Sequence, residues 1–240
     1  MPLKPAAPSA QSLTPVIAID GPSASGKGTV AQLVAQALGF HYLDSGALYR
    51  IVALAARRMD IGWQTGGALA EMTRKLRITF VQDKILLSGE NISGENMGSE
   101  DITQAIRSEE MSRGASEVAV HKQVRAALLD LQHSFRQAPG LVADGRDMAS
   151  VVFTDAKLKI FLTASVEVRA ERRFKQLVNK GLQANYENIL RDLQLRDLRD
   201  RERIVSPLIQ TKGALLLDTT RRSIDGAVQF VLDAYKNTCI

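Results

Sequence analysis

The sequence predicts an α/β fold in which a parallel sheet of about five strands lies between layers of helices. Residues 16–20 are a short apolar run, typical of a buried parallel strand, and a glycine-containing turn follows at residues 21–28. Apolar residues then recur at helical spacing over residues 29–38, before Gly39, a common helix stop. Strand, glycine turn and helix are a frequent opening of α/β domains.

Four later apolar runs supply the other strands of this sheet. They lie at residues 42–43, 141–143, 158–162 and 215–217. Three of them lead directly into an aspartate, namely Asp44, Asp144 and Asp218. Because the carboxyl ends of parallel strands meet at one edge of a sheet, we expect polar residues there to line a ligand site. A helix at residues 224–235 closes the domain.

The middle of the chain has a different pattern. Residues 76–81 and 85–87 predict a β-hairpin, and Gly89, Gly94 and Gly98 are further turn signals. Helical patterns follow at residues 102–108 and 115–135, so we expect an inserted α+β domain. The predicted division is a disordered tail at residues 1–14, a core domain at 15–70 and 136–240, and the inserted domain at 71–135.

The composition is ordinary for a globular protein, with 45% of the 240 residues hydrophobic and 24% charged. The single cysteine, Cys239, permits no intrachain disulfide, and no apolar run reaches the roughly 18 residues of a membrane span. Residues 1–15 lack the apolar centre of a secretory signal, so we expect a cytoplasmic protein. The net charge of +5 suggests an anionic partner, which charge alone does not identify.

Residues 21–29 read GPSASGKGT and form a phosphate-binding pattern in its expected context, between a strand and a helix. In such a loop, backbone N–H groups converge on phosphate oxygens and the lysine, here Lys27, reaches the β- and γ-phosphates. The pattern predicts a three-layer fold like that of the P-loop NTPases. The predicted ATP-binding residues are Gly21, Pro22, Ser23, Ala24, Ser25, Gly26, Lys27, Gly28 and Thr29.

One position in this loop departs from the usual pattern. The Ser or Thr that commonly follows the lysine and binds Mg²⁺ is replaced by Gly28, with Thr29 one place later. We therefore expect Mg²⁺, the implied cofactor, to be held largely by phosphates and water. Asp144, at the end of a predicted strand, is the candidate side chain for the metal or its water shell.

Arginines gather in the second half of the chain. Arg196, Asp200 and Arg203 stand at i, i+4 and i+7, which places them on one face of a predicted helix. A second cluster contains Arg169, Arg172 and Arg173. Such runs are often solvated faces with ion pairs. With two further arginines near strand ends, Arg50 and Arg146, they also suit a pair of phosphorylated ligands whose charge must be neutralised.

The motifs together resemble one family. IDGPSASGKGT, LDSGALYR, ISGE, ADGRDM, VVF and RDLRDRER occur in the order found in bacterial cytidylate kinases, and they span nearly the whole chain after the N-terminal segment. The resemblance implies transfer of the γ-phosphoryl group of ATP to CMP or dCMP by a nucleoside monophosphate kinase. It also implies a monomer with a short lid at about residues 168–185, while the composition leads us to expect no nucleic-acid or membrane partner.

The resemblance also implies residue roles. Those for the acceptor phosphate are Ser45, Arg50, Arg146 and Arg203. Those for the ribose hydroxyls are Arg196 and Asp200, and those for the base are Ser116, Arg125 and Asp147. The lid would carry Arg169, Arg172 and Arg173. The residues expected to act on the group in transfer are Lys27, Arg146, Arg203, Arg169 and Arg173.

Several of these residues also have a structural explanation. Ser45 suits a helix N-cap, and Arg50 suits an exposed helix surface, as do Ser116 and Arg125. Asp144, Arg146 and Asp147 would also suit a structural salt bridge.

The base-reading residues make chemical sense. Cytosine offers an amino donor at N4 and acceptors at N3 and O2, so the Asp147 carboxylate suits N4 and the Arg125 guanidinium suits N3 and O2. Uracil reverses the polarity at two of these positions, so the set favours CMP over UMP. No general base is expected, because an acceptor phosphate is already ionised.

Two rival functions remain open at this point. One is a P-loop kinase with another acceptor, such as UMP, AMP or a shikimate-like metabolite. The other is a basic nucleic-acid-binding protein, which is disfavoured because aromatic residues make up only 5% of the chain and acids are interspersed among the arginines.

Overall fold

The computed structural model of the chain describes residues 14–81, 84–90 and 96–238. The expected disordered tail lies outside the described residues except for Thr14, as do Gly94 and Cys239. Among the described residues, no helix is long and apolar enough to cross a membrane.

The predicted parallel sheet is confirmed. Its five strands follow the order β2-β6-β1-β7-β8, and every neighbouring pair is parallel. The strands are β1 (Val16–Asp20), β2 (His41–Asp44), β6 (Leu141–Gly145), β7 (Leu158–Thr163) and β8 (Leu215–Asp218). All residues of β1 and β6 are buried, as expected of apolar strands in the middle of a sheet with both faces covered.

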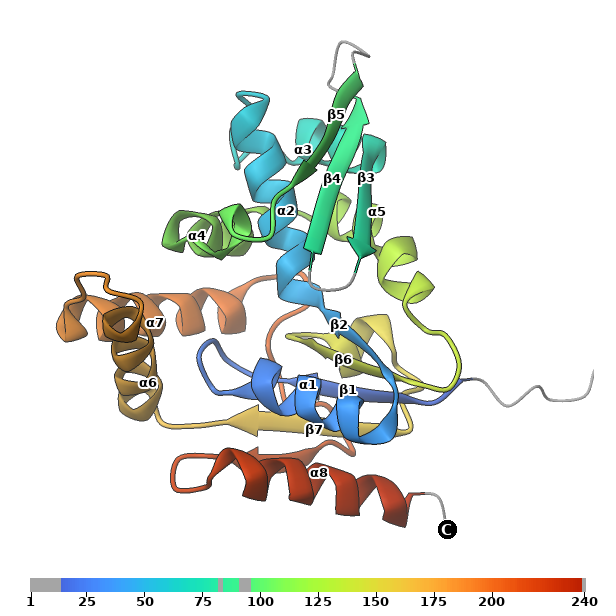
Figure 1. Cartoon of the computed structure of the whole chain (residues 1–240), viewed down its shortest axis with the longest axis vertical. Helices are drawn as coiled ribbons and strands as arrows, with labels where there is room; N and C mark the ends of the chain where they lie inside the picture. The colour runs from blue at the N-terminus through green and yellow to red at the C-terminus, as the bar shows by residue number, and fades with distance from the viewer. Residues whose placement is uncertain (1–13, 82–83, 91–95, 239–240) are drawn as a thin grey trace, which may run out of the picture.

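Helices cover both faces of this sheet, which gives the expected three layers (Figure 1). On one face, α1 (Lys27–Leu38) and α8 (Ile224–Asn237) pack on inward residues such as Ile19 and Ile160. On the other face, α2 (Ser45–Arg58), α5 (Lys122–Ser134) and the π-turn η2 (Met148–Val152) share a core with Ala18 and Ala143. The two cores hold the sheet, and with it the strand ends, in a fixed position.

Glycines fix both ends of α1. Gly26, the N-cap, has φ 92°, and Gly39, the C-cap, has φ 65°, both in the left-handed region that glycine adopts without strain. Gly21 is required for a different reason. A Cβ atom on Gly21 would lie 1.9 Å from the carbonyl oxygen of Leu162 in β7, so only glycine lets the chain leave β1 along this path.

The predicted hairpin is confirmed, and a third strand that was not predicted extends it. β3 (Leu76–Val81), β4 (Lys84–Glu90) and β5 (Asn96–Asp101) form an antiparallel sheet. Gly89 and Gly98, expected in turns, lie instead within β4 and β5. The register shifts at Gly89, between Ser88 and Glu90, and Gly98 has φ 71°. Glycine in a strand often marks such an irregularity, which is why the turn interpretation was wrong here.

The predicted helix at residues 115–135 is two helices. After the 3₁₀ turn η1 (Ala105–Arg107), α4 (Glu109–Val118) begins at its N-cap Ser108, whose Oγ accepts the Met111 N–H at 3.2 Å. α5 starts after a break at residues 119–121. α4 packs on α2, whereas α5 packs on α3 (Gly66–Lys75), so the chain must turn between them. The expected domain boundary at residue 71 falls within α3, and the division into domains stays a prediction.

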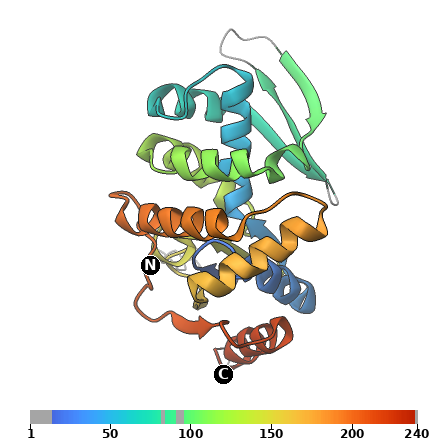
Figure 2. The same ribbon diagram turned by 90° about the vertical axis from the view of Figure 1, so that its left-hand side faces the viewer.

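The last two helices before β8 are α6 (Val166–Asn179) and α7 (Tyr186–Glu202). They pack against each other beside the carboxyl ends of the strands, and α7 also contacts α4 (Figures 1 and 2). Arg203 was expected on the face of α7 with Arg196 and Asp200. It lies just beyond the helix as the C-cap, in an extended conformation.

Candidate active site

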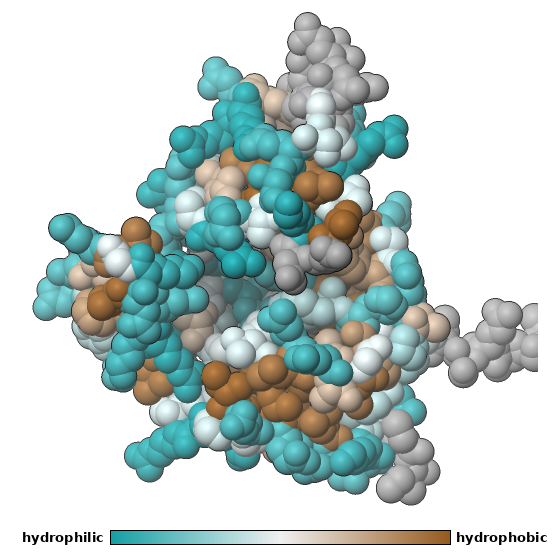
Figure 3. All heavy atoms as spheres, in the orientation of Figure 1, coloured by the Kyte–Doolittle hydropathy of each residue, from teal (hydrophilic) through white to brown (hydrophobic). Residues whose placement is uncertain are grey.

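The predicted phosphate loop leaves β1 at the centre of the sheet, where β6 lies on one side and β7 on the other. This change of direction in strand order is where ligands of open α/β folds bind. A hydrophilic recess lies between the sheet and the upper helices in Figure 3. The loop also has a left-handed residue, Ala24 at φ 58°, so its backbone is tightly folded.

Lys27 lies at the first position of α1, with its side chain 11% exposed. Its Nζ is 3.6 Å from Oδ1 of Asp144, at the end of β6. Burial, and after it the Arg146 charge, lowers the pKa of Lys27 to about 8, against the opposing effect of Asp144. Burial raises the pKa of Asp144, which the Lys27 charge partly counters. This ammonium group is therefore weakly solvated and available to an anion.

The lowered pKa leads to an expected pH dependence. Above pH 8 the free protein loses the Lys27 proton, so kcat/KM for ATP should fall as pH rises through about 8. At saturating ATP, the triphosphate holds the proton on Lys27, and kcat/KM for the acceptor should not show the same alkaline loss. Steady-state rates between pH 6 and 10 for each substrate test this. The same fall in kcat/KM above pH 8 for both ATP and the acceptor would contradict this prediction.

The structure gives a reason for Gly28. A Cβ at this position would lie 3.1 Å from Oδ2 of Asp144 and 3.6 Å from the Tyr42 hydroxyl. That hydroxyl donates to Oδ2 of Asp144 at 3.0 Å. The Asp144–Tyr42 pair therefore occupies the space beside Gly28 where a Ser or Thr side chain would lie. Sequence reasoning found Asp144 but missed Tyr42, for which no local pattern gave a signal.

Arg146 connects the phosphate loop to α7. Its NH2 donates to the Ser23 Oγ at 2.6 Å, and its Nε donates to Oδ2 of Asp200 at 2.8 Å. Arg196, one turn before Asp200, donates to the Ser112 Oγ of α4 at 2.7 Å. Burial, reinforced by the Arg146 charge, lowers the pKa of Arg196 to about 10. The structure thus brings these predicted residues together beside the loop.

Arg125 and Asp147, both predicted to read a base, form a buried ion pair. The guanidinium also lies over the Tyr49 ring at 5.4 Å, and its NH1 donates to the carbonyl of Ala119 at 3.2 Å. Ser116 is buried as well, on α4. Neither Ser116 nor Arg125 is the exposed helix residue that their alternative interpretation required, whereas the pairing of Asp147 with Arg125 also fits the structural salt bridge considered for Asp147.

Ser45 and Arg50 lie on α2. Asp44, not Ser45, is the N-cap of this helix, and its Oδ1 accepts the Ala47 N–H at 3.0 Å. Ser45 is the first helical residue, and its Oγ accepts a hydrogen bond from Gln132 Nε2 at 2.9 Å. The alternative interpretation of Ser45 as an N-cap is therefore wrong. Arg50 is half-exposed, with its NH1 3.9 Å from Oδ2 of Asp44.

The three arginines assigned to a lid have different environments in α6. Arg169 is buried, pairs with Asp197 of α7 and donates to the carbonyl of Ser23 at 3.1 Å. Arg172 donates to the carbonyl of Ser25 at 3.1 Å. Both residues therefore bond to the backbone of the phosphate loop, and their assignment to a lid stays a prediction. Arg173 instead pairs with Glu109 at the start of α4.

Unpaired polar atoms mark the same region. Among the described residues, four buried side-chain N or O atoms lack a hydrogen-bond partner: Ser116 Oγ, Arg196 Nε, Arg203 NH2 and Thr211 Oγ1. Three of the four belong to residues that the sequence assigned to the acceptor. A buried polar atom without a partner costs about 1–3 kcal/mol, so a ligand that pairs with these atoms would recover that cost.

Two further residues of the site escaped the sequence interpretation. Asp20, at the end of β1, accepts the N–H groups of Met148 and Ala149, both at 2.8 Å, and so fixes the turn that follows Asp147. Burial raises the pKa of Asp20 to about 7. Because Asp20 ends a predicted strand, the sequence could have identified it as a site residue. Thr219 is the second residue, and its Oγ1 donates to the carbonyl of Ser25 at 3.1 Å. No sequence pattern marked Thr219 as part of the site.

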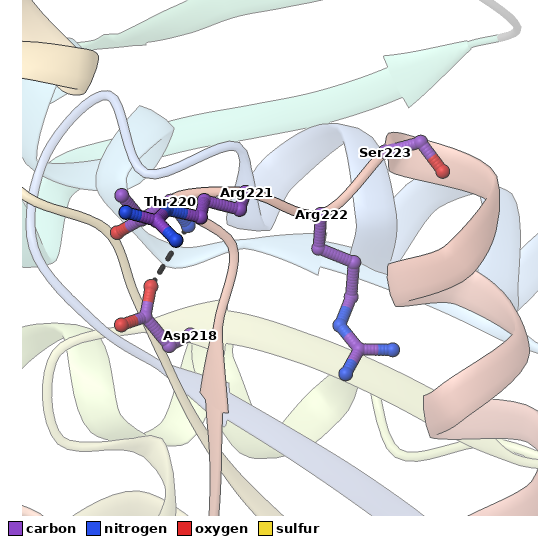
Figure 4. A pocket seen from close by; sticks show the side chains of 5 residues that line it. All are labelled: Asp218, Thr220, Arg221, Arg222 and Ser223. Atoms are coloured by element: carbon purple, nitrogen blue, oxygen red, sulfur yellow. Dashed lines mark hydrogen bonds between the residues drawn. The ribbon is translucent and has the colours of Figure 1, made fainter.

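A pocket of about 560 Å³ lies beside Thr219, in the turn between β8 and α8. Its walls are formed by Asp218, Thr220, Arg221, Arg222 and Ser223, shown in Figure 4. Asp218 Oδ1 accepts the Thr220 N–H at 2.8 Å and orders this turn. Because Thr219 bonds to the phosphate loop, the pocket adjoins the loop on the side opposite β6.

Comparison with known proteins identifies the family that the sequence motifs resemble. The chain matches the cytidylate kinase family over residues 17–237. The cytidylate kinase of Polynucleobacter necessarius subsp. necessarius (strain STIR1) is 56% identical over 224 residues, which is 93% of this chain and 100% of that protein. That of Cupriavidus necator (strain ATCC 17699) is 55% identical over 218 residues, covering 91% and 94% of the two chains.

A third relative extends the match. The cytidylate kinase of Paraburkholderia phymatum (strain DSM 17167) is 53% identical over 234 residues, covering 98% of this chain and 97% of that protein. The family match spans the phosphate loop, the inserted strands and the arginine-bearing helices. This chain therefore belongs to the cytidylate kinase family.

Proposed function

We propose that this protein transfers the γ-phosphoryl group of ATP to CMP, giving ADP and CDP. The observation that carries the proposal is the set of unpaired buried atoms on Ser116, Arg196 and Arg203, which lie on residues assigned to three different parts of one nucleotide. Family membership and the phosphate loop support the same activity. dCMP is a second acceptor, because Arg196 and Asp200 can still bind the hydroxyl that remains.

The donor would bind along the strand ends. Backbone amides of the phosphate loop and Lys27 would hold the β- and γ-phosphates, since the Lys27 ammonium is poorly solvated and close to the loop. The pocket at residues 218–223 adjoins the loop and has room for the donor nucleoside. Arg172 would keep the loop in shape through its hydrogen bond to Ser25.

The residues present fit a magnesium ion held mostly by the triphosphate and water. Among the described residues, no group of three or more His, Cys, Asp or Glu side chains could hold a metal alone. Asp144 is the carboxylate nearest Lys27, and one of its oxygens already accepts from Tyr42, so it suits a contact through water. When bound, Mg²⁺ would neutralise phosphate charge during transfer.

The chain's own groups then account for catalysis by position and charge. The acceptor phosphate is ionised at neutral pH, so no side chain needs to remove a proton. Arg146 would contact both the loop and the acceptor, because it already joins Ser23 to Asp200. Such fixed cations stabilise charge in the transition state without reorganisation, which is the main source of rate in phosphoryl transfer.

An acceptor panel tests the proposal. With ATP and Mg²⁺, ADP release should be fast with CMP and dCMP, and slower by at least about ten-fold in kcat/KM with UMP and AMP. A shikimate-like acceptor should give only background. A preference for UMP or AMP would leave a P-loop kinase but remove the assignment of CMP. Retention on DNA with a steep salt dependence, without ADP release, would favour a nucleic-acid-binding protein.

A further inference from the structure

We propose that Ser206 is a specificity-determining positioning residue that holds Arg125 and Arg203 in their ligand-binding orientations and so couples recognition of the base to recognition of the phosphate. The inference rests on the proposed function, because it concerns the same acceptor site. Ser206 lies in the segment after α7, three residues beyond RDLRDRER, the last of the motifs that carry the family resemblance.

Two hydrogen bonds carry the inference. The Ser206 Oγ accepts from Arg125 Nε at 3.1 Å, and the Ser206 carbonyl oxygen accepts from Arg203 Nε at 2.5 Å. The side chain and the main chain of one residue thus each bind a guanidinium. Arg125 is assigned to the base and Arg203 to the acceptor phosphate. A movement of Ser206 would therefore displace both arginines together.

The hydrogen bonds of Arg125 leave the donors that a cytosine needs. A guanidinium carries five N–H donors. In this structure Nε donates to Ser206, NH1 to the carbonyl of Ala119 and NH2 to Asp147, which leaves one N–H on each terminal nitrogen. Two free donors match the two acceptors of cytosine, N3 and O2. Because Ser206 occupies Nε, the guanidinium is held so that its terminal nitrogens remain available.

The backbone around Ser206 is fixed. Ser206 has φ 52°, in the left-handed region that is strained for a residue other than glycine. Two residues later, the buried Leu208 donates its N–H to the carbonyl of Asp200 at 2.8 Å, which closes the turn on α7. Asp200 in turn binds Arg146. The strained turn is thus anchored to the helix that carries the ribose-binding residues.

Arg203 supplies the phosphate side of the coupling. Its Nε is held by Ser206, whereas its NH2 is buried without a partner. An arginine whose Nε is held by a hydrogen bond, and whose terminal nitrogen has no partner, is well placed to donate that terminal N–H to an anion. The carbonyl of Ser206 therefore sets where that terminal nitrogen points.

The test compares Ser206→Ala and Ser206→Gly with wild type and with Ser134→Ala. Both Ser206 variants lose the hydroxyl that holds Arg125, and glycine also tolerates the left-handed backbone. Ser134 lies on the same helix as Arg125, and its Oγ bonds only locally, to the carbonyl of Leu131, so it is a matched control. The readouts are KM for CMP and for ATP, the CMP-to-UMP ratio of kcat/KM, and the thermal midpoint.

Both Ser206 variants should raise KM for CMP and lower the CMP-to-UMP ratio, each by about five-fold or more, with KM for ATP unchanged. Ser134→Ala should match wild type. A variant that loses thermal stability but keeps its KM for CMP and its ratio would make Ser206 merely structural and overturn the inference. Either Ser206 variant keeping the wild-type ratio would do the same. Wild-type activity on CMP in the same assay keeps the proposed function separate from this outcome.

Discussion

Lys27→Ala should lower kcat by about 10²- to 10³-fold, the loss expected when one fixed group that stabilises transition-state charge is removed. Lys27 is the phosphate-loop side chain with a poorly solvated charge, as its pKa of about 8 indicates. Arg146, the arginine with the largest charge effect on Lys27, is already bound to Ser23 and Asp200 and is a poor substitute for it. A coupled ADP-release assay with saturating CMP measures the change.

The same variant should keep its fold. Removal of Lys27 leaves Asp144 without its nearest cation, but burial already raises the pKa of Asp144, so the carboxyl can take up a proton. The thermal midpoint should therefore fall by less than about 4 °C, or about 1 kcal/mol for a chain of this size. Lys236→Ala, on α8 far from the loop, is the control and should change neither value. Near-normal turnover by Lys27→Ala would remove the loop from catalysis.

Asp147→Ala should lower the CMP-to-UMP ratio of kcat/KM by about 5- to 150-fold, since one buried polar mismatch costs about 1–3 kcal/mol. The Asp147 carboxylate is buried beside Arg125, where it would accept the N4 amino group of cytosine. UMP presents a carbonyl at that position, which the carboxylate repels and the alanine variant tolerates. Rates with CMP and UMP, measured on one protein preparation, give the ratio.

Asp147→Ala also leaves Arg125 as a buried charge without its partner, which destabilises the protein. The CMP-to-UMP ratio of kcat/KM is therefore a better measurement for this variant than either rate alone. Loss of the partner should lower stability by about 3–5 kcal/mol, as in other buried ion pairs. Both substrates are tested on the same folded molecules, so instability changes both rates alike. Asp155→Ala, which breaks the exposed pair with Arg136, should leave the ratio unchanged. An unchanged ratio in Asp147→Ala would exclude this residue from base recognition.

The sequence predicted the sheet and the phosphate loop because both depend on local patterns. Buried parallel strands such as β1 are continuous apolar runs, and the loop is defined by glycines and a lysine at fixed spacing. The order of the motifs also predicted the family that the comparisons then identified. The strands, the phosphate loop and the motif order can therefore be predicted without knowing which distant residues they contact.

The inserted domain was harder to predict, and the errors have a physical cause. Gly89 and Gly98 look like turn residues in sequence, but the neighbouring strands pair across them. The break between α4 and α5 arises because each helix packs on a different partner. The strand pairing around Gly89 and Gly98 and the break between α4 and α5 depend on contacts between residues distant in sequence. A short stretch of sequence carries no information about such contacts.

By itself, then, the sequence determined the strands of the sheet, the phosphate loop and the family. Only the tertiary structure decided which arginines bond to the loop and which keep a buried N–H without a partner, because Arg169 and Arg203 have the same chemistry and differ in their surroundings. It also brought Ser206 to Arg125, 81 residues away in sequence. Hydrogen bonds between such distant residues depend on how the helices pack, which sets distances that no local spacing encodes.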